Sequence, residues 1–281
     1  MPEAPQAPTA ADSTPLPGDA YVQSFARGLA VIRSFSSQHP SQTLADVARQ
    51  TGLTRAGARR ILLTLQHLGY VQADGRQFSL TPRILDLGFA YLSSLPLWNL
   101  AQPVMEGLVT VLRESCSAAV LDGADIVYVL RVPTHQIMSI NLGTGSRLPA
   151  TCTSMGRVLL AGLPPEEARQ RVLAAPRQAL TTRTLTDPEA VLAAIQQTRQ
   201  QGWCLVDQEL EDGLISLAAP LRDRAGRTIA ALNVSGHTQR TPADHLLAHA
   251  LPRLLQAAEQ ISQLLAMKTG GARPPGLGTR A

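Results

Sequence analysis

The stretch from residue 43 to residue 80 constrains the fold more than any other part of the chain. Thr43 can cap a short helix, and Gly52 can end it because glycine accepts a positive φ without a Cβ clash. Thr54 can cap a second helix, in which apolar residues recur at helical spacing. We therefore predict two helices joined by a tight turn. The predicted inward positions of the second helix are Ile61, Leu62, Leu65 and Leu68.

A short hairpin is expected after the second helix, which Gly69 should end. Residues 70–73 and 77–80 are β-rich and flank Asp74-Gly75, a dipeptide that suits a tight hairpin turn. Helix, turn, helix and hairpin together are typical of a winged helix-turn-helix DNA-binding domain, predicted over residues 21–81. An earlier helix starting at Ser24 would complete it, with Phe25, Leu29, Ile32 and Phe35 facing inward.

The second helix has the composition of a recognition helix. Small residues permit close approach to a major groove about 12 Å wide, and arginine can bind a guanine edge or a phosphate through two hydrogen bonds. Residues 21–83 hold eight arginines and two aspartates, a balance of +6, whereas the whole chain carries only +4. This excess favours double-stranded DNA over the alternative, a three-helix core with a solvated basic face. The predicted DNA contacts are Thr54, Arg55, Ala56, Arg59, Arg60 and Arg76.

Composition narrows the remaining classes of protein. A length of 281 residues suits two domains, and an aromatic content of 4% argues against nucleic-acid binding by base stacking. Three widely spaced cysteines form no CxxC pair, so neither a zinc finger nor a disulfide framework is indicated. We expect no cofactor, and a reducing cytoplasm is the simplest compartment.

Both ends of the chain are predicted to be disordered tails, over residues 1–20 and 268–281, because they are rich in proline or glycine. The first lacks the basic start and apolar run of a signal peptide. No run of about 18 apolar residues appears, so no membrane span is expected. Thr81-Pro82 should start a linker helix over 82–96, which is apolar on more than one side. That surface favours a dimer seam; burial against its own domain is the alternative.

Residues 97–267 are predicted to form an α+β domain. Strands at both ends with helices between them favour one antiparallel sheet carrying helices over a series of βαβ units. The predicted strands are 117–121, 126–132, 136–141, 203–208, 215–221 and 228–235, and the predicted helices are 99–114, 154–161, 164–173, 187–201 and 246–267. Leu100, Val104, Leu108, Val111 and Leu112 would form the apolar side of the helix over 99–114.

Two parts of this domain could bind a small acid. In the first, small polar residues lead into the helix at 154, and the amides of Ser154, Met155 and Gly156 with the Thr153 hydroxyl could bind a carboxylate. Plain capping by Thr153 or Ser154 is the alternative. The second consists of polar groups on strands or at strand ends, which need partners when buried. A ligand or other protein groups could supply them. These residues are Asp207, Glu209, Ser216, Asn233 and Ser235.

An enzymatic alternative would use Cys152 or Ser154 as nucleophile, His237 as base and Asp207 to orient it. No GxSxG elbow is present, and we predict no catalytic residue. The helical i, i+4 pair of histidines at 245 and 249 lacks the glutamate of HExxH, so no metal site is predicted either.

Four segments carry a resemblance to a known family: TRAGARRILLTLQHLGYV (54–71), RLPATCTSMGRVLLA (147–161), DQE (207–209) and AAPLRDRAGRTIAALNVSG (218–236). With these, the chain resembles the IclR family of bacterial transcriptional regulators from about residue 21 to residue 267. It looks most like the PcaR/PcaU/PobR branch, which governs catabolism of aromatic acids. The resemblance implies a winged-helix domain, a dimerising linker helix and a GAF-like effector domain.

The resemblance also implies partners. Family members are dimers or tetramers whose effectors are small organic acids; in this branch these include protocatechuate, 4-hydroxybenzoate and β-ketoadipate. Members of the branch often activate transcription, for which RNA polymerase is the partner. A repressor answering a small non-aromatic acid such as pyruvate or glyoxylate is the alternative. Leu142, Met155 and Val234 could line space for a ring. The family's pocket falls on Ser154, Met155, Asp207, Ser216, Asn233 and Ser235, where Ser216 replaces a cysteine and Asn233 a serine of several relatives.

Overall fold

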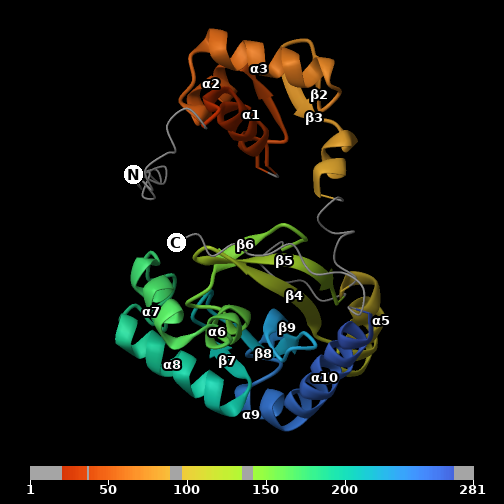
Figure 1. The fold of residues 1–281 in the computed structure, drawn as a ribbon, viewed down its shortest axis with the longest axis vertical. Helices are drawn as coiled ribbons and strands as arrows, with labels where there is room; N and C mark the ends of the chain where they lie inside the picture. Colours follow the sequence, from red (N-terminus) through yellow and green to blue (C-terminus); the bar gives the residue numbers. More distant parts are fainter. Residues whose placement is uncertain (1–20, 37, 89–96, 135–141, 269–281) are drawn as a thin grey trace. The chain divides into compact units, whose positions relative to one another are not determined.

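The computed structural model describes residues 21–36, 38–88, 97–134 and 142–268. The chain divides into two compact units, residues 1–91 and 92–281 (Figure 1). The tail predicted over 1–20 and the strand predicted over 136–141 lie outside the described residues. So does the tail at the other end from residue 269 onward, while residue 268 still belongs to the last helix.

The first unit is a winged helix-turn-helix, as predicted. Three helices pack around a small apolar core, and the strands form a three-stranded antiparallel sheet in the order β1-β3-β2. Its elements are α1 Gln23–Ser34, β1 Ser41–Thr43, α2 Leu44–Thr51, α3 Arg55–His67, β2 Val71–Asp74 and β3 Gln77–Leu80.

Local capping chemistry fixes the two central helices. The Thr43 side chain accepts a hydrogen bond from the Asp46 amide at 3.3 Å, and the Asp46 carboxylate accepts one from the Thr43 amide. Gly52 ends α2 with φ +67°, the left-handed conformation that glycine adopts most easily. Thr54 accepts a hydrogen bond from the Gly57 amide at 3.1 Å. All three predicted helix boundaries are therefore confirmed.

Some predicted inward residues are instead exposed. Phe25 is 67% exposed, Leu29 38% and Leu68 47%, because the core of this unit is closed by other side chains. Buried side chains of the core are Val31, Val47, Ala58, Leu62, Leu65 and Val71.

The wing also differs in detail from the prediction. Asp74 pairs with Gln77, so the turn residues are Gly75 and Arg76 rather than Asp74 and Gly75. A third strand, β1, pairs with β3 where the sequence suggested only a break around Pro40.

The predicted linker helix is described only over its first residues. The Thr81 side chain accepts a hydrogen bond from the Arg83 amide, and Pro82 opens a 3-10 turn rather than an α-helix. This turn spans Pro82–Ile84, and residues 85–88 continue as helix. Leu85 and Leu87 are exposed there. The linker helix as a whole, and its role as a dimer seam, remain predictions.

The second unit contains a six-stranded antiparallel sheet in the order β6-β5-β4-β9-β8-β7. This confirms the predicted α+β class and the antiparallel sheet carrying helices. The short strand β6 was not predicted. The strands are β4 Ser115–Asp122, β5 Asp125–Val132, β6 Arg147–Pro149, β7 Cys204–Asp207, β8 Leu214–Arg222 and β9 Thr228–His237.

Helices cover the two faces of this sheet (Figure 1). An apolar cluster joins one face to α5 and α10, and a second cluster joins the other face to α6, α7 and α8. In α5 the buried residues include Ala101, Met105 and Leu108, whereas Val111, predicted on the apolar side, is exposed. The helices are α5 Leu97–Leu112, α6 Ser154–Ala161, α7 Pro165–Ala174, α8 Pro188–Gln201, α9 Ala243–His245 and α10 Leu251–Lys268.

The helix predicted over 246–267 begins differently from a regular α-helix. Residues Leu246–Ala250 form a π-helical turn, which follows α9 and leads into α10. None of the helices in the described segments is both long and apolar enough to cross a membrane.

Candidate DNA-binding helix and candidate effector pocket

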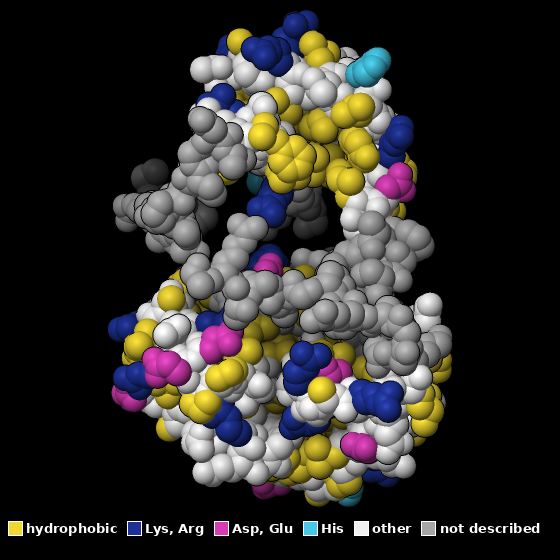
Figure 2. Space-filling view, in the orientation of Figure 1, with side chains coloured by type: hydrophobic (Ala, Val, Ile, Leu, Met, Phe, Trp, Pro, Cys, Tyr) yellow, Lys and Arg dark blue, Asp and Glu magenta, His cyan; other side chains and the backbone are white. Residues whose placement is uncertain are grey.

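Helix α3 separates an apolar side from a basic one. Ala58, Leu62 and Leu65 are buried at spacings of four and three residues, so they share one side of the helix. Basic side chains gather on the surface of the first unit where α3 lies (Figure 2). The residues predicted to contact DNA are all exposed, namely Thr54, Arg55, Ala56, Arg59, Arg60 and Arg76.

The arginines of this surface are available for an external partner. Across the described segments, no hydrogen bond or ion pair engages the guanidinium groups of Arg55, Arg59, Arg60 or Arg76. Arg49 in the neighbouring helix differs, since it pairs with Asp46 at 2.8 Å. Uncommitted guanidinium groups on the exposed side of α3 and in the β2–β3 turn can bind phosphates and base edges.

The second unit encloses a cavity of ≈ 20 Å³ on the face of its sheet that packs against α6. Six of the predicted effector residues line it: Thr153, Ser154, Met155, Ser216, Asn233 and Ser235. The other lining residues are Tyr128, Leu142, Cys152, Val206, Leu210 and Leu214. Of these, Leu142 was predicted to line space for a ring.

The alternation of side chains along the strands explains which residues meet. Ser216 of β8 lies opposite Ser235 of β9 in register, and Asn233 precedes Ser235 by one period of two. Their side chains therefore share one face. The same alternation in β5 and β7 directs Tyr128 and Val206 towards the pocket. These two lining residues were not predicted, although the alternation is visible in the sequence.

Two predicted residues lie elsewhere. Val234, between Asn233 and Ser235, belongs to the apolar cluster on the opposite face. Asp207 follows Val206, which lines the cavity, and the Asp207 carboxylate pairs with Arg183 at 2.8 Å. Asp207 is therefore not a lining residue of this cavity.

The start of α6 forms one wall of the pocket. Thr153 caps this helix, since its hydroxyl accepts from the Gly156 amide at 3.2 Å and donates to the Pro149 carbonyl at 3.0 Å. Thr153 therefore caps α6, as the alternative to carboxylate binding proposed. The Gly156 amide already donates to Thr153, so it is not free to bind a ligand. The amides of Ser154 and Met155 remain, because the first N–H groups of a helix have no acceptor within it. The Ser154 hydroxyl contacts the Ser216 hydroxyl at 2.8 Å.

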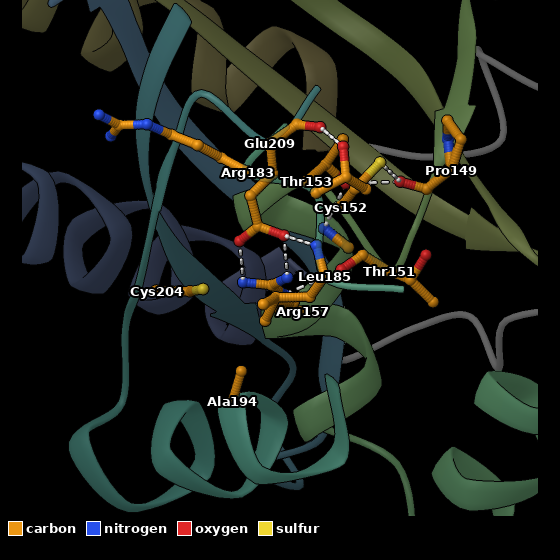
Figure 3. Close-up of polar contacts among 12 residues, drawn as sticks. Pro149, Thr151, Cys152, Thr153, Arg157, Arg183, Leu185, Ala194, Cys204 and Glu209 are labelled. Atoms are coloured by element: carbon orange, nitrogen blue, oxygen red, sulfur yellow. Dashed lines mark hydrogen bonds and ion pairs between the residues drawn. The ribbon is translucent and has the colours of Figure 1, made fainter. Parts of the chain in front are cut away.

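A buried ion pair fixes the position of α6. The Arg157 guanidinium donates two hydrogen bonds of 2.6 Å to the Glu209 carboxylate, and a third of 2.8 Å to the Thr151 carbonyl (Figure 3). The Leu185 amide also donates to Glu209, at 3.1 Å. Glu209 is therefore one of the predicted polar residues whose partners are protein groups. The pair connects α6 to the segment after β7.

A close backbone contact holds the same helix in place. A Cβ atom at Gly156 would lie 2.1 Å from the Ala150 carbonyl oxygen. Only glycine lets the first turn of α6 approach the end of the preceding segment so closely.

The ionisable groups of the pocket are neutral near pH 7. Burial, with a smaller contribution from the nearby Glu209 carboxylate, raises the pKa of the Cys152 thiol to about 11. Burial also raises the pKa of Tyr128 to about 12, against a smaller opposing effect of Arg131. Cys152 therefore carries no thiolate that could act as a nucleophile at neutral pH.

The residues of the hydrolase alternative do not form a catalytic triad. Asp207 is engaged by Arg183, Ser154 contacts Ser216, and His237 accepts a hydrogen bond from the Gln239 amide at 3.3 Å. Among the described residues, no group of three or more histidine, cysteine, aspartate or glutamate side chains could hold a metal ion.

An exposed basic helix in a winged helix-turn-helix unit, together with an α+β unit that contains a small cavity, is typical of a DNA-binding transcriptional regulator. Two family models match the chain: the IclR helix-turn-helix domain over residues 24–75 and the C-terminal domain of bacterial transcriptional regulator IclR over residues 89–263. The chain belongs to the IclR family of bacterial transcriptional regulators, and the matching families are regulators rather than enzymes.

Individual relatives share most of their length with this chain. The Pca regulon regulatory protein of Pseudomonas putida is 46% identical over 87% of this chain and 84% of its own. The p-hydroxybenzoate hydroxylase transcriptional activator of Acinetobacter baylyi is 35% identical over 87% and 92%. The predicted resemblance to this branch of the family is thereby confirmed.

Solved structures share the fold over most of this chain. A transcriptional regulator from Rhodococcus sp. RHA1 is 52% identical, with a TM-score of 0.80 over 88% of this chain and 99% of its own. An IclR homolog from Microbacterium hydrocarbonoxydans, complexed with 4-hydroxybenzoate, is 26% identical, with a TM-score of 0.77 over 87% and 99%.

Proposed function

We propose that this regulator responds to a small carboxylic acid from aromatic catabolism, with protocatechuate, 4-hydroxybenzoate and β-ketoadipate as the candidates. We further propose that it acts in the cytoplasm as a homodimer or tetramer on a double-stranded DNA operator, and that it activates transcription through RNA polymerase. The observation that carries the proposal is the enclosed pocket of the second unit. The relatives named for the Pca regulon and for p-hydroxybenzoate hydroxylase support the chemical class.

The pocket combines an apolar wall with a polar end. Tyr128, Val206, Leu210 and Leu214 offer apolar surface to a ring, while hydroxyl and amide groups from α6, β8 and β9 offer hydrogen bonds. This combination is typical of sites that bind small organic molecules. The lining residues that we propose to contact the effector are Thr153, Ser154, Met155, Ser216, Asn233 and Ser235.

The size of the cavity has a mechanistic consequence. At ≈ 20 Å³ it is far smaller than the roughly 300 Å³ or more of a typical ligand pocket. An aromatic acid can enter only if lining side chains move apart. That movement would repack the second unit and, through the linker helix, change the spacing or tilt of two DNA-binding units. A coupling of about 1–3 kcal/mol would suffice for a useful switch.

The same small cavity favours a second candidate. A compound such as pyruvate or glyoxylate requires less expansion than a benzoate, so a regulator of this family that represses transcription in response to such an acid is the runner-up. The size of the acid that binds therefore separates the two proposals.

The test is the thermal shift of the full-length protein with protocatechuate, 4-hydroxybenzoate, β-ketoadipate, pyruvate and glyoxylate. A ligand at about 100 times its dissociation constant stabilises the folded state by roughly 2.7 kcal/mol. We expect a clear shift with an aromatic acid or β-ketoadipate. A shift only with pyruvate or glyoxylate would establish the second candidate instead, and no shift with any of the five would overturn both.

A further inference from the structure

The polar face of the sheet extends beyond the residues that line the cavity. Ser117 of β4 lies in register with Asn233 of β9 on one side and with Arg131 of β5 on the other. Residues directly opposite one another on neighbouring strands project from the same face. Arg131, Ser117 and Asn233 therefore form a row across three strands, and Asn233 lines the cavity.

The neighbouring residues confirm which face carries this row. Ala119, two positions after Ser117, pairs with Tyr128, and both belong to the apolar cluster on the pocket side. Cys116 and Ala118 belong to the cluster on the other side, under α5 and α10. The row thus continues the pocket face, with Tyr128 of the cavity lining in the next row.

Polar groups in this row are enclosed and suited to an anion. Ser117 is fully buried, and among the described residues its hydroxyl has no hydrogen-bond partner. Such a group is unfavourable unless something bonds to it. The Asn233 side-chain oxygen accepts from the Ser117 amide at 3.0 Å, which leaves the Asn233 NH₂ group as a donor. Arg131 is half-buried, with its Nη1 atom shielded from solvent.

A cation near the cavity would balance the charge of a bound acid, which the neutral amides at the start of α6 do not. None of the described residues that line the cavity is charged, so nothing in the lining itself balances a carboxylate. Arg131 supplies the positive charge in the adjoining row, close enough to Tyr128 to lower the pKa of that phenol. A guanidinium fork matches the geometry of a carboxylate through two parallel hydrogen bonds.

We propose that Arg131, assisted by the Ser117 hydroxyl and the Asn233 NH₂ group, binds the carboxylate of the effector. The inference rests on the proposed function and adds the residue that makes a negative charge a requirement for binding. The other end of the acid then lies towards β8, near the Ser154 and Ser216 hydroxyls. Arg131 also takes part in an interaction within the chain, which the carboxylate would share or replace.

The experiment compares acids with their neutral analogues on the full-length protein. Isothermal titration calorimetry measures binding of protocatechuate, 4-hydroxybenzoate and β-ketoadipate. It then measures binding of the amide of each acid that binds, with both carboxyl groups of β-ketoadipate converted so that the analogue is neutral. We expect the wild-type protein to prefer acid over amide by about tenfold or more, the scale of a charge-assisted hydrogen bond. Arg131→Gln should weaken acid binding by that factor and remove the preference.

Two further variants complete the design. Arg131→Lys keeps the charge but loses the planar fork, so we expect a several-fold loss of acid affinity. Arg227→Gln is the matched control, because Arg227 pairs with Asp223 in the β8–β9 turn and should leave acid affinity unchanged.

The possible results separate this inference from the proposed function. A folded Arg131→Gln protein with wild-type preference for the acid overturns the inference and leaves the proposed function standing. A wild-type protein that binds none of the acids overturns both. If Arg131→Gln does not fold, Arg131→Lys decides, since unchanged acid affinity overturns the inference and a several-fold loss supports it.

Discussion

Arg157 and Glu209 form an ion pair whose side chains are only 4% and 10% exposed. Removing one partner of a buried pair leaves an uncompensated charge, which typically costs about 3–5 kcal/mol. We expect Glu209→Gln to lower the free energy of unfolding by roughly this amount. Glu167→Gln is the control, because its pair with Arg171 is partly exposed and worth about 1 kcal/mol or less. Urea denaturation measures both, and equal losses would contradict the argument.

Recognition of DNA is also decided at single residues. Arg55→Ala and Arg59→Ala should each weaken operator binding by about 1–3 kcal/mol, since both guanidinium groups are exposed on α3 without partners among the described residues. Arg49→Ala is the control, because that side chain is engaged by Asp46. Titration of a labelled operator at fixed salt measures the affinities. If both α3 variants bound the operator with wild-type affinity, α3 would not be the recognition helix.

Single residues also show how far the sequence predicts this molecule. Thr43, Thr54 and Thr153 were readable as caps because each accepts a hydrogen bond from an amide only three residues away. Gly52 was readable because the left-handed end of a helix favours glycine. Asp207 was assigned to the pocket because the sequence does not reveal its distant partner, Arg183.

The start of helix α6 forms one wall of the pocket and carries Thr153, Ser154 and Met155. Gly156→Ala would place a Cβ atom 2.1 Å from the Ala150 carbonyl, a backbone group that cannot rotate away. We expect lower stability, by about 1–3 kcal/mol, and weaker effector binding, because α6 must shift. Gly107→Ala is the control: nothing lies within 4 Å of its Cβ position in α5, so it should be neutral or stabilise by up to about 1 kcal/mol. Thermal denaturation with and without effector compares them.

Elements that depend on distant neighbours were harder to predict than those with local signals. The three-residue strand β1 exists because it pairs with β3, more than thirty positions later. The period of α1 indicated one apolar side, but a period cannot say whether other side chains cover it, and Phe25 and Leu29 are exposed. By contrast, the antiparallel sheet was predictable because β-rich runs, some of them separated by polar turns, lie at both ends of the domain with helices between them.

The free energy of unfolding of the whole molecule should decrease in alkaline solution. Burial raises the pKa of Tyr128 to about 12 and that of Cys152 to about 11, from ordinary values of 10.0 and 9.0. The folded state therefore retains protons that the unfolded state releases, so this stability is present below pH 9 and is lost as pH rises towards 12. Each such proton contributes a slope of about 1.4 kcal/mol per pH unit.

Urea denaturation at pH 8 and pH 10.5 checks this dependence. We expect a lower free energy of unfolding at pH 10.5, and a smaller decrease in a Cys152→Ala variant, because that change removes one of the buried thiols. Equal free energies at the two pH values in the wild-type protein would contradict the argument.

The central claim is that effector binding in one unit changes DNA binding by the other. The most direct measurement is operator affinity with and without a saturating acid that binds the protein, at fixed salt, on a duplex selected from a random pool. We expect the acid to change the operator affinity by about 5- to 150-fold, or to change promoter output from the bound operator. An acid that binds the protein and alters neither operator affinity nor promoter output would contradict it.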